Sequence, residues 1–294
     1  MAGNSIYVKV AELVVGIVPL DNSWSVPSNY KPFLCDLTDE ETLLMEMRLG
    51  CEPIDVDGLK PLAVFDELGF VQKLYERNCG GYMYQVFDAS GNLAATMTSD
   101  ERFLHNDVWV ARENRDLADF GFNNVMMVAY AFSAAYRDVL LMHSSVVLKD
   151  GKGYMFLGKS GTGKSTHSSL WLKHIPDTSL LNDDNPVVRL TNGEVVVFGS
   201  PWSGKTPCYK QQSAIVGALV LLEQKPYNKI GREPVVSALS ALLGSCSIMM
   251  WDKPSYSRLI NTISQVLAKV PVFHLECLPD EAAVCLSYDT IAKR

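Results

Sequence analysis

The sequence predicts a mixed α/β protein in two parts, a β-rich N-terminal domain over residues 1–118 and an α/β domain over residues 119–294. Short apolar or alternating runs bounded by turn residues dominate the first part. Strand-like and helix-like segments interleave in the second part. The charge also changes along the chain: residues 1–115 hold 9 Lys/Arg and 18 Asp/Glu, whereas residues 116–294 hold 17 and 15. The near-neutral second part is the better host for an anionic ligand.

The overall composition excludes several classes of protein. With 294 residues, 48% of them hydrophobic, the chain is neither disordered nor collagen-like. A net charge of −7 argues against a nucleic-acid partner. Seven cysteines without a CxxC motif indicate reduced thiols rather than disulfides or a zinc site. No leader is seen, and no apolar run reaches the roughly 18–20 residues that a membrane helix needs. We therefore expect a cytoplasmic protein without a membrane partner.

In the first part, β-structure is the main expectation. Residues 6–18 mix alternation with a buried run, and residues 82–100 read as a hairpin that turns at Ser90–Asn92. Two helical patches are predicted at 38–48 and 66–77. No constellation of catalytic or metal-binding residue types is seen here, so the role of this domain stays open.

Residues 121–141 predict a helix that opens the second part. Asn123 or Asn124 would cap it, and Ala, Met and Leu would fill it. Its Met and aromatic residues are interpreted as core. The domain boundary is placed just before this helix.

The remaining elements follow in alternation, as an α/β domain requires. The first two strands, 143–148 and 154–158, surround an Asp150–Gly151 turn. The later segments are a helix 167–174, a strand 179–184, a hairpin 186–199, a strand 214–223, helices 234–249 and 254–269, a strand 272–278 and a helix 279–292.

The segment Gly158–Ser165 matches the phosphate-binding pattern GxxxxGK[ST]. Glycines let several backbone N–H groups point at phosphate oxygens, and the helix that follows aims its positive end at the same anion. Lys164 would contact the β- and γ-phosphates, and Ser165 would offer its hydroxyl to Mg²⁺. The predicted nucleotide-binding residues are Gly158, Ser160, Gly161, Thr162, Gly163, Lys164, Ser165 and Thr166.

The segment Gly199–Thr206 satisfies the same pattern, but we reject it as a second nucleotide site. Pro201 has no N–H to donate, and Trp202 is bulky where backbone must approach phosphate. We interpret it instead as a loop beside the active site, with an ordinary connector as the alternative. The predicted substrate-loop residues are Ser203, Gly204 and Lys205.

Asp183 and Asp184 end a predicted strand, where a loop would face the phosphates. One carboxylate would hold Mg²⁺ and the other would accept a proton from an incoming hydroxyl. The alternative is that they belong to a simple turn. A turn centred on residues 150–151 places His143 opposite Gly158, so His143 is predicted to belong to the active site. The four remaining histidines are predicted to be structural: His105, His167, His174 and His274.

The order of His143, the loop 158–165 and the pair Asp183–Asp184 resembles the catalytic domain of HPr kinase/phosphorylase. It is more similar to HPr-kinase-like proteins that include small-molecule and peptide kinases. The resemblance implies a sheet related to that of phosphoenolpyruvate carboxykinase. It also implies that His143 lies near the phosphates, that Lys164 and Ser165 bind nucleotide and metal, and that the two aspartates supply metal binding and a general base.

The expected function is a Mg²⁺-dependent kinase that transfers the γ-phosphoryl group of ATP to a serine-like hydroxyl, on a small molecule or a peptide. Lys164, His143, Asp183 and Asp184 are the predicted catalytic residues; Ser165, Asp183 and Asp184 are the predicted metal ligands. One alternative is an ATP- or ADP-sensing module without phosphoryl transfer, and another is a carboxykinase-like enzyme. The resemblance leaves a homo-oligomer open.

Overall fold

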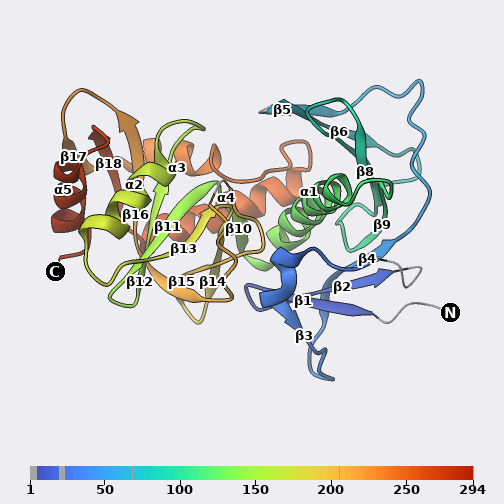
Figure 1. The fold of residues 1–294 in the computed structure, drawn as a ribbon, viewed down its shortest axis with the longest axis horizontal. Helices are drawn as coiled ribbons and strands as arrows, with labels where there is room; N and C mark the ends of the chain where they lie inside the picture. The colour runs from blue at the N-terminus through green and yellow to red at the C-terminus, as the bar shows by residue number, and fades with distance from the viewer. Residues whose placement is uncertain (1–4, 20–23, 68, 205, 294) are drawn as a thin grey trace. The chain divides into compact units, whose positions relative to one another are not determined.

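The strands form two nine-stranded sheets of mixed direction, one in each of two compact units (Figure 1). The prediction of a mixed α/β protein is confirmed, because each unit combines one mixed sheet with helices. The computed structural model describes residues 5–19, 24–67, 69–204 and 206–293.

The first unit is one sheet with a long helix packed against it. Its strands follow the order β3-β1-β2-β4-β9-β8-β7-β6-β5. The pairs β2–β4 and β4–β9 are parallel, and the other pairs are antiparallel. The elements are β1 (Ile6–Val10), β2 (Leu13–Pro19), η1 (Ser28–Phe33), β3 (Leu34–Cys35), β4 (Leu43–Leu49), β5 (Ala63–Glu67), β6 (Phe70–Glu76), β7 (Tyr82–Phe87), β8 (Leu93–Ser99), β9 (His105–Val110) and α1 (Arg115–Ala134).

The two helical patches predicted in this unit are wrong. Residues 38–48 contain most of β4, and residues 66–77 contain β6. Glu, Leu and Met favour helices in isolation, but β4 pairs with β2 on one side and β9 on the other. Met45 and Met47 are fully buried there. Burial on both sides of a central strand outweighs the weak helix preference of these residues.

Helix α1 belongs to the first unit. The sequence predicts instead that it opens the second part, and this prediction is wrong. The helix contacts β4, β7, β8 and β9, and the two units divide between Ala134 and Ala135, later than the predicted boundary at 118/119. The side chain of Asn114 caps the helix by accepting from the N–H of Asp116 at 2.9 Å. Asn123 and Asn124, the predicted caps, lie inside the helix and accept side-chain hydrogen bonds from Asn29 and Gln72.

The second unit is a three-layer α/β/α arrangement. Its strands follow the order β10-β14-β15-β16-β12-β11-β13, and β18 pairs with both β16 and β17. The elements are η2 (Ala135–Arg137), β10 (Val139–Leu141), β11 (Ser144–Lys149), β12 (Lys152–Leu157), α2 (Lys164–His174), β13 (Ser179–Asp184), β14 (Val187–Thr191), β15 (Glu194–Phe198), β16 (Ser213–Gln224), β17 (Lys229–Arg232), α3 (Val235–Leu243), α4 (Lys253–Lys269), β18 (Val272–Cys277) and α5 (Glu281–Ile291).

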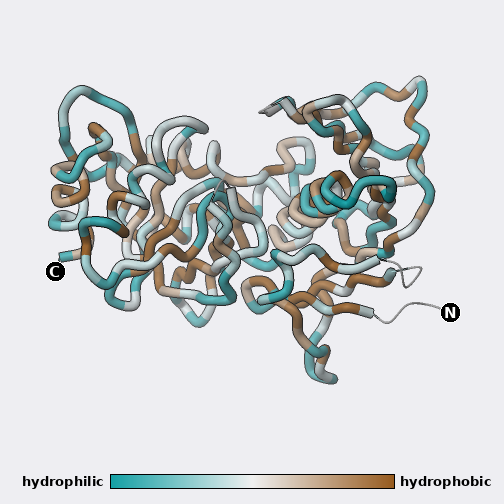
Figure 2. The backbone as a smooth tube through the Cα atoms, in the orientation of Figure 1, coloured by the Kyte–Doolittle hydropathy of each residue, from teal (hydrophilic) through white to brown (hydrophobic). Residues whose placement is uncertain are grey.

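Separate hydrophobic clusters fill the two faces of this sheet. On one face α2 and α5 contribute Trp171 and Val284, and on the other α3 and α4 contribute Leu242 and Ile263. When the backbone is coloured by hydropathy, the hydrophobic stretches coincide with the strands in the middle of the second unit (Figure 2). Within the described ranges, no helix is long and apolar enough to cross a membrane.

The direction of four strands decides where chemistry can occur. Strands β12, β16 and β18 are parallel neighbours, and β13 runs the same way because both β12 and β13 are antiparallel to β11. The carboxyl ends of all four strands therefore lie at one edge of the sheet, where α/β proteins bind ligands.

Candidate functional site

The phosphate-binding loop lies between a strand and a helix, the context that its sequence pattern requires. Strand β12 ends at Leu157 and α2 begins at Lys164. Gly158, Gly161 and Gly163 have φ angles of 147°, 83° and 96°. A Cβ at Gly158 would lie 2.7 Å from the hydroxyl oxygen of Thr162, so this position has no room for a side chain. The loop therefore has the tight backbone path that brings N–H groups to an anion at the start of α2.

Lys164 lies inside this loop and close to two acids. Its side chain is buried, and Nζ donates to the carbonyl oxygens of Gly158 at 2.9 Å and Lys159 at 3.2 Å. Burial lowers the pKa of Lys164, and the charges of Asp184 and Asp183 act in the opposite direction. The predicted cation and the predicted acids thus share one electrostatic environment. Ser165 and Thr166 follow in the exposed first turn of α2.

The register of β11 joins the loop to the acids. Ser144 lies opposite Leu157, the last residue before the loop, and also opposite Asp184. One strand therefore separates β12 from β13, and two interstrand spacings amount to roughly 10 Å. The predicted hairpin register is confirmed, because its turn occupies Asp150–Gly151. His143 directly precedes β11 at this edge.

The two aspartates have different surroundings. Asp183 is 3% exposed and pairs with Ser145, whose hydroxyl oxygen lies 2.7 Å from that of Ser168 on α2. Because paired residues point to the same face of a sheet, Asp183 lies on the face that α2 covers. The carboxylate of Asp184 is one-third exposed and lies 2.9 Å from Nδ1 of His143.

The backbone of Asp184 adopts a conformation that side chains disfavour. Its φ angle is 152°, and Asn185 Nδ2 donates to its second carboxylate oxygen at 2.8 Å. Such backbone geometry recurs at functional sites, where the surrounding structure holds it in place. The carboxylate is thus oriented by two side-chain contacts and by its own main chain.

The predicted substrate loop lies directly beside these acids. Ser203 forms a β-bridge with Asp184, and Gly204 N–H donates to the carbonyl of Asp183 at 2.5 Å. Among the described residues between this loop and β16 there is no helix, whereas the phosphate-binding loop is followed directly by α2. Lys205, the third predicted residue of this loop, lies outside the described residues.

A buried polar network holds the substrate loop in place. Asn182, which is fully buried, donates through Nδ2 to the hydroxyl of Ser200 and to the carbonyl of Trp202, both at 3.1 Å. The Ser200 hydroxyl donates to the carbonyl of Asn185 at 2.6 Å. These contacts tie the loop to the strand that carries both acids.

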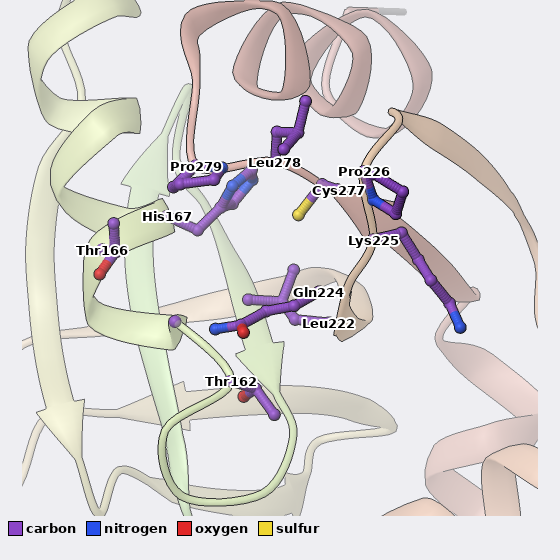
Figure 3. Close-up of a pocket in the computed structure, with 11 residues that line it drawn as sticks. Thr162, Thr166, His167, Leu222, Gln224, Lys225, Pro226, Cys277, Leu278 and Pro279 are labelled. Atoms are coloured by element: carbon purple, nitrogen blue, oxygen red, sulfur yellow. The ribbon is translucent and has the colours of Figure 1, made fainter.

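A pocket of about 590 Å³ opens on the other side of the phosphate-binding loop (Figure 3). Its lining residues come from the loop and α2, from the end of β16 and from the end of β18. They are Thr162, Gly163, Thr166, His167, Leu222, Gln224, Lys225, Pro226, Cys277, Leu278 and Pro279. The sequence does not predict this pocket, because the pocket depends on strand order: β16 lies beside β12, and β18 lies beside β16.

His167 forms one wall of this pocket and is held by buried partners. Trp171 Nε1 donates to its Nε2 at 3.2 Å, and the hydroxyl of Ser287 lies 3.2 Å from the same nitrogen. Burial lowers the pKa of His167 to about 4, so the imidazole is neutral at neutral pH. The other three histidines predicted to be structural each lie beside a carboxylate. His105 lies beside Asp100, His174 lies beside Glu281, and His274 lies beside both Glu223 and Glu233.

In the described part of the chain, no group of three or more His, Cys, Asp or Glu side chains is arranged to hold a metal ion. The oxygen donors at the edge are the Ser165 hydroxyl and the carboxylates of Asp183 and Asp184. One or two carboxylates together with phosphate oxygens are the usual ligand set of Mg²⁺ in nucleotide sites. The residues present therefore fit a magnesium ion that is bound together with a polyphosphate.

Comparisons with known proteins find likeness among solved structures. No family model matches the sequence, and no curated protein matches it. Among solved structures, the chain is similar to the Hpr(Ser) kinase/phosphatase from Coxiella burnetii, with a TM-score of 0.27 and 13% sequence identity. The match covers 50% of this chain and 93% of the other.

Proposed function

We propose that this protein is a Mg²⁺-dependent kinase that transfers the γ-phosphoryl group of ATP to a hydroxyl group on a small molecule or a peptide. One observation carries the proposal. Ser144 lies opposite both Leu157 and Asp184, so a phosphate-binding loop and an acid with a histidine partner share one edge of the sheet.

Binding of the triphosphate falls to the loop 158–163 and the first turn of α2. The N–H groups of the loop and the positive end of the helix attract the phosphates. Lys164 adds a full positive charge that already lies inside the loop. Ser165 and Asp183 are the proposed Mg²⁺ ligands, and the ion would neutralise phosphate charge. Asp183 suits this role because it lies on the face that α2 covers.

Asp184 is the better candidate for general base. Its carboxylate is one-third exposed, whereas Asp183 is almost completely buried, so an acceptor hydroxyl can reach Asp184 more easily. Asp184 takes the proton, the hydroxyl oxygen bonds to the γ-phosphorus, and the bond to the β-γ bridging oxygen breaks to release ADP. His143 keeps the carboxylate oriented during this step.

The acceptor would approach over the substrate loop. Ser203 and Gly204 lie against the main chain of the two acids, so an acceptor bound along this loop has its hydroxyl beside Asp184. Positioning of this kind supplies much of the rate in phosphoryl transfer, since the protein is asked for little covalent chemistry.

Three variants test the proposal with labelled ATP and a library of hydroxyl compounds and Ser/Thr peptides. Lys164→Ala is expected to weaken ATP binding at least about tenfold, because a charge-assisted hydrogen bond contributes about 1.5–3 kcal/mol. Asp184→Asn is expected to keep ATP binding and to lose about 10²–10⁴ in turnover. Asp177→Asn is the matched control, since Asp177 is exposed and precedes the opposite end of β13.

The outcomes separate the candidate functions. Full activity in both Lys164→Ala and Asp184→Asn would refute the assignment of the site. ATP binding by the wild type without any labelled product would instead favour a nucleotide-sensing module, and oxaloacetate-dependent release of CO₂ would favour a carboxykinase.

A further inference from the structure

We propose that a second pocket, which lies in the first unit, binds a small zwitterion of the amino-acid type. The carboxylate of the ligand would contact Arg77, and its ammonium group would contact Glu101. The inference does not depend on the proposed kinase activity. It assigns a ligand to the unit whose role the sequence leaves open.

This pocket has a volume of about 570 Å³. Its lining residues come from the turn 77–81 between β6 and β7, from the turn 100–104 between β8 and β9, and from the adjoining strands β4, β8 and β9. All of these elements belong to the sheet of the first unit. The Arg, Asp and Glu residues of the wall are Arg48, Arg77, Asp100, Glu101, Arg102 and Asp107.

Hydrogen bonds within both turns hold the wall of this pocket in place. In the first turn, the N–H of Gly80 donates to the carbonyl of Arg77 at 3.1 Å. In the second turn, the carboxylate of Asp100 accepts from the N–H groups of Arg102 and Leu104 at 2.9 Å and 3.0 Å. The pocket is therefore formed without a ligand, which lowers the entropic cost of binding one.

The wall concentrates arginine in a part of the chain that is otherwise acidic. Residues 1–115 hold 18 Asp/Glu and 9 Lys/Arg, and five of the nine are arginines. Three of these five line the pocket, namely Arg48, Arg77 and Arg102. A guanidinium group binds a carboxylate through two parallel hydrogen bonds, which an ammonium group does not provide. The wall is therefore suited to a ligand with a carboxylate.

Two of the acids in the wall are already engaged. Arg48 binds both carboxylate oxygens of Asp107, with Nε 2.7 Å from Oδ1 and Nη2 3.0 Å from Oδ2. Asp100 accepts from the main chain of its own turn, and Nδ1 of His105 lies 2.9 Å from its Oδ2. These groups shape the wall and leave little charge for a ligand.

Arg77 and Glu101, in contrast, remain available. Arg77 Nη1 donates to the carbonyl of Ser99 at 3.3 Å, and within the described ranges Arg77 forms no ion pair. Glu101 is exposed, and among the described residues its carboxylate has no hydrogen-bond or ion-pair partner. Its Oε1 lies beside the turn that carries Arg77, at 3.1 Å from the place that a Cβ on Gly80 would take. The two charges thus belong to one part of the wall without neutralising each other.

Opposite charges that do not pair with each other suit a ligand that carries both. An α-amino acid has its carboxylate and its ammonium group on one carbon atom, so it can satisfy both side chains at once. A simple anion would be repelled by Glu101, and a simple cation would be repelled by Arg77. Thr98 and Leu104 also line the pocket and offer a hydroxyl and apolar surface to the side chain of the ligand.

The first test uses the wild-type protein without nucleotide. Isothermal titration calorimetry measures the binding of each of the twenty common amino acids at concentrations up to about 10 mM, and we expect at least one to bind. For that amino acid, the N-acetyl derivative lacks the ammonium charge and the amide lacks the carboxylate charge. Each derivative is expected to bind at least about tenfold more weakly, a factor that corresponds to about 1.4 kcal/mol. Absence of binding by all twenty, or equal binding of either derivative, would overturn the inference.

The second test removes the two charges from the protein one at a time. Arg77→Gln is expected to bind the amino acid and its amide equally, because the group that distinguishes them is gone. Glu101→Gln is expected to bind the amino acid and its N-acetyl derivative equally, for the same reason. Arg112→Gln and Glu113→Gln are the matched controls, since both residues are exposed and lie outside the pocket wall.

The outcomes of the second test are separate from those of the proposed function. Wild-type affinity and discrimination in both Arg77→Gln and Glu101→Gln would overturn the zwitterion site. None of these measurements uses ATP, so their failure would leave the kinase proposal standing. Refutation of the kinase proposal would equally leave this inference standing.

Discussion

The buried histidine in the wall of the pocket beside α2 predicts a definite loss of stability in acid. Burial lowers the pKa of His167 from 6.5 to about 4. The unfolded chain therefore binds a proton at pH values where the folded protein does not. Stability from the neutral imidazole is fully present above pH 6.5, declines as the pH falls toward 4, and changes no further below that. At about 1.36 kcal/mol per unit of pKa, the loss amounts to about 3 kcal/mol.

The comparison variant is His167→Gln. Its amide oxygen can accept from Trp171 Nε1 in place of His167 Nε2 but does not titrate. Urea unfolding of both proteins between pH 7.5 and pH 4 gives the free energy of unfolding at each pH. Because other groups titrate in both proteins, the difference between the two profiles isolates His167. We expect the wild type to lose about 3 kcal/mol more than the variant over this range.

Two results would refute this reasoning. Parallel pH profiles for the wild type and His167→Gln would show that the folded and unfolded states bind the proton equally. An NMR titration provides the direct measurement, since the imidazole signal missing from the variant identifies His167. Titration of that signal near pH 6.5 would show that the ring is accessible to water.

Two further predictions concern the surroundings of the site and the first unit. Asn182→Ala removes the amide that bonds Ser200 and Trp202, so we expect about 2 kcal/mol lower stability in urea and a higher KM for the acceptor. Its affinity for ATP should be unchanged, and an equal loss of ATP affinity would show that this network supports more than the substrate loop. Gly121→Ala should destabilise the protein by about 1–3 kcal/mol, because a Cβ there would lie 2.5 Å from the carbonyl oxygen of Ala94. A rise in the unfolding midpoint would instead show that the better helix propensity of alanine dominates.

Local turn chemistry explains why part of the site could be predicted. A two-residue turn with positive φ at Asp150 and Gly151 fixes the register of the hairpin, and the register places residue 143 at the start of the phosphate-binding loop. The strand that ends in Asp183 and Asp184 was also recognisable, because apolar residues precede the acids.

Long-range packing explains the errors. Residues 38–48 favour a helix locally, yet pairing with β2 on one side and β9 on the other makes most of them a central strand. Helix α1 begins earlier than predicted because Asn114 caps it, and its packing against β8 assigns it to the first unit. The pocket depends on β18 lying beside β16, although about fifty residues separate the two strands in the chain. No local pattern carries that information.

The main-chain geometry of Asp184 has a consequence for how the protein would respond to selection for heat resistance alone. A non-glycine residue at a φ of 152° is held at an energetic penalty of order 1–3 kcal/mol, which glycine would relieve. Variants enriched solely for thermal tolerance would therefore tend to exchange this acid for glycine and to forfeit the chemistry that depends on it. Persistence of the carboxylate in a thermally selected library would mean that its contacts with His143 and Asn185 outweigh the backbone strain.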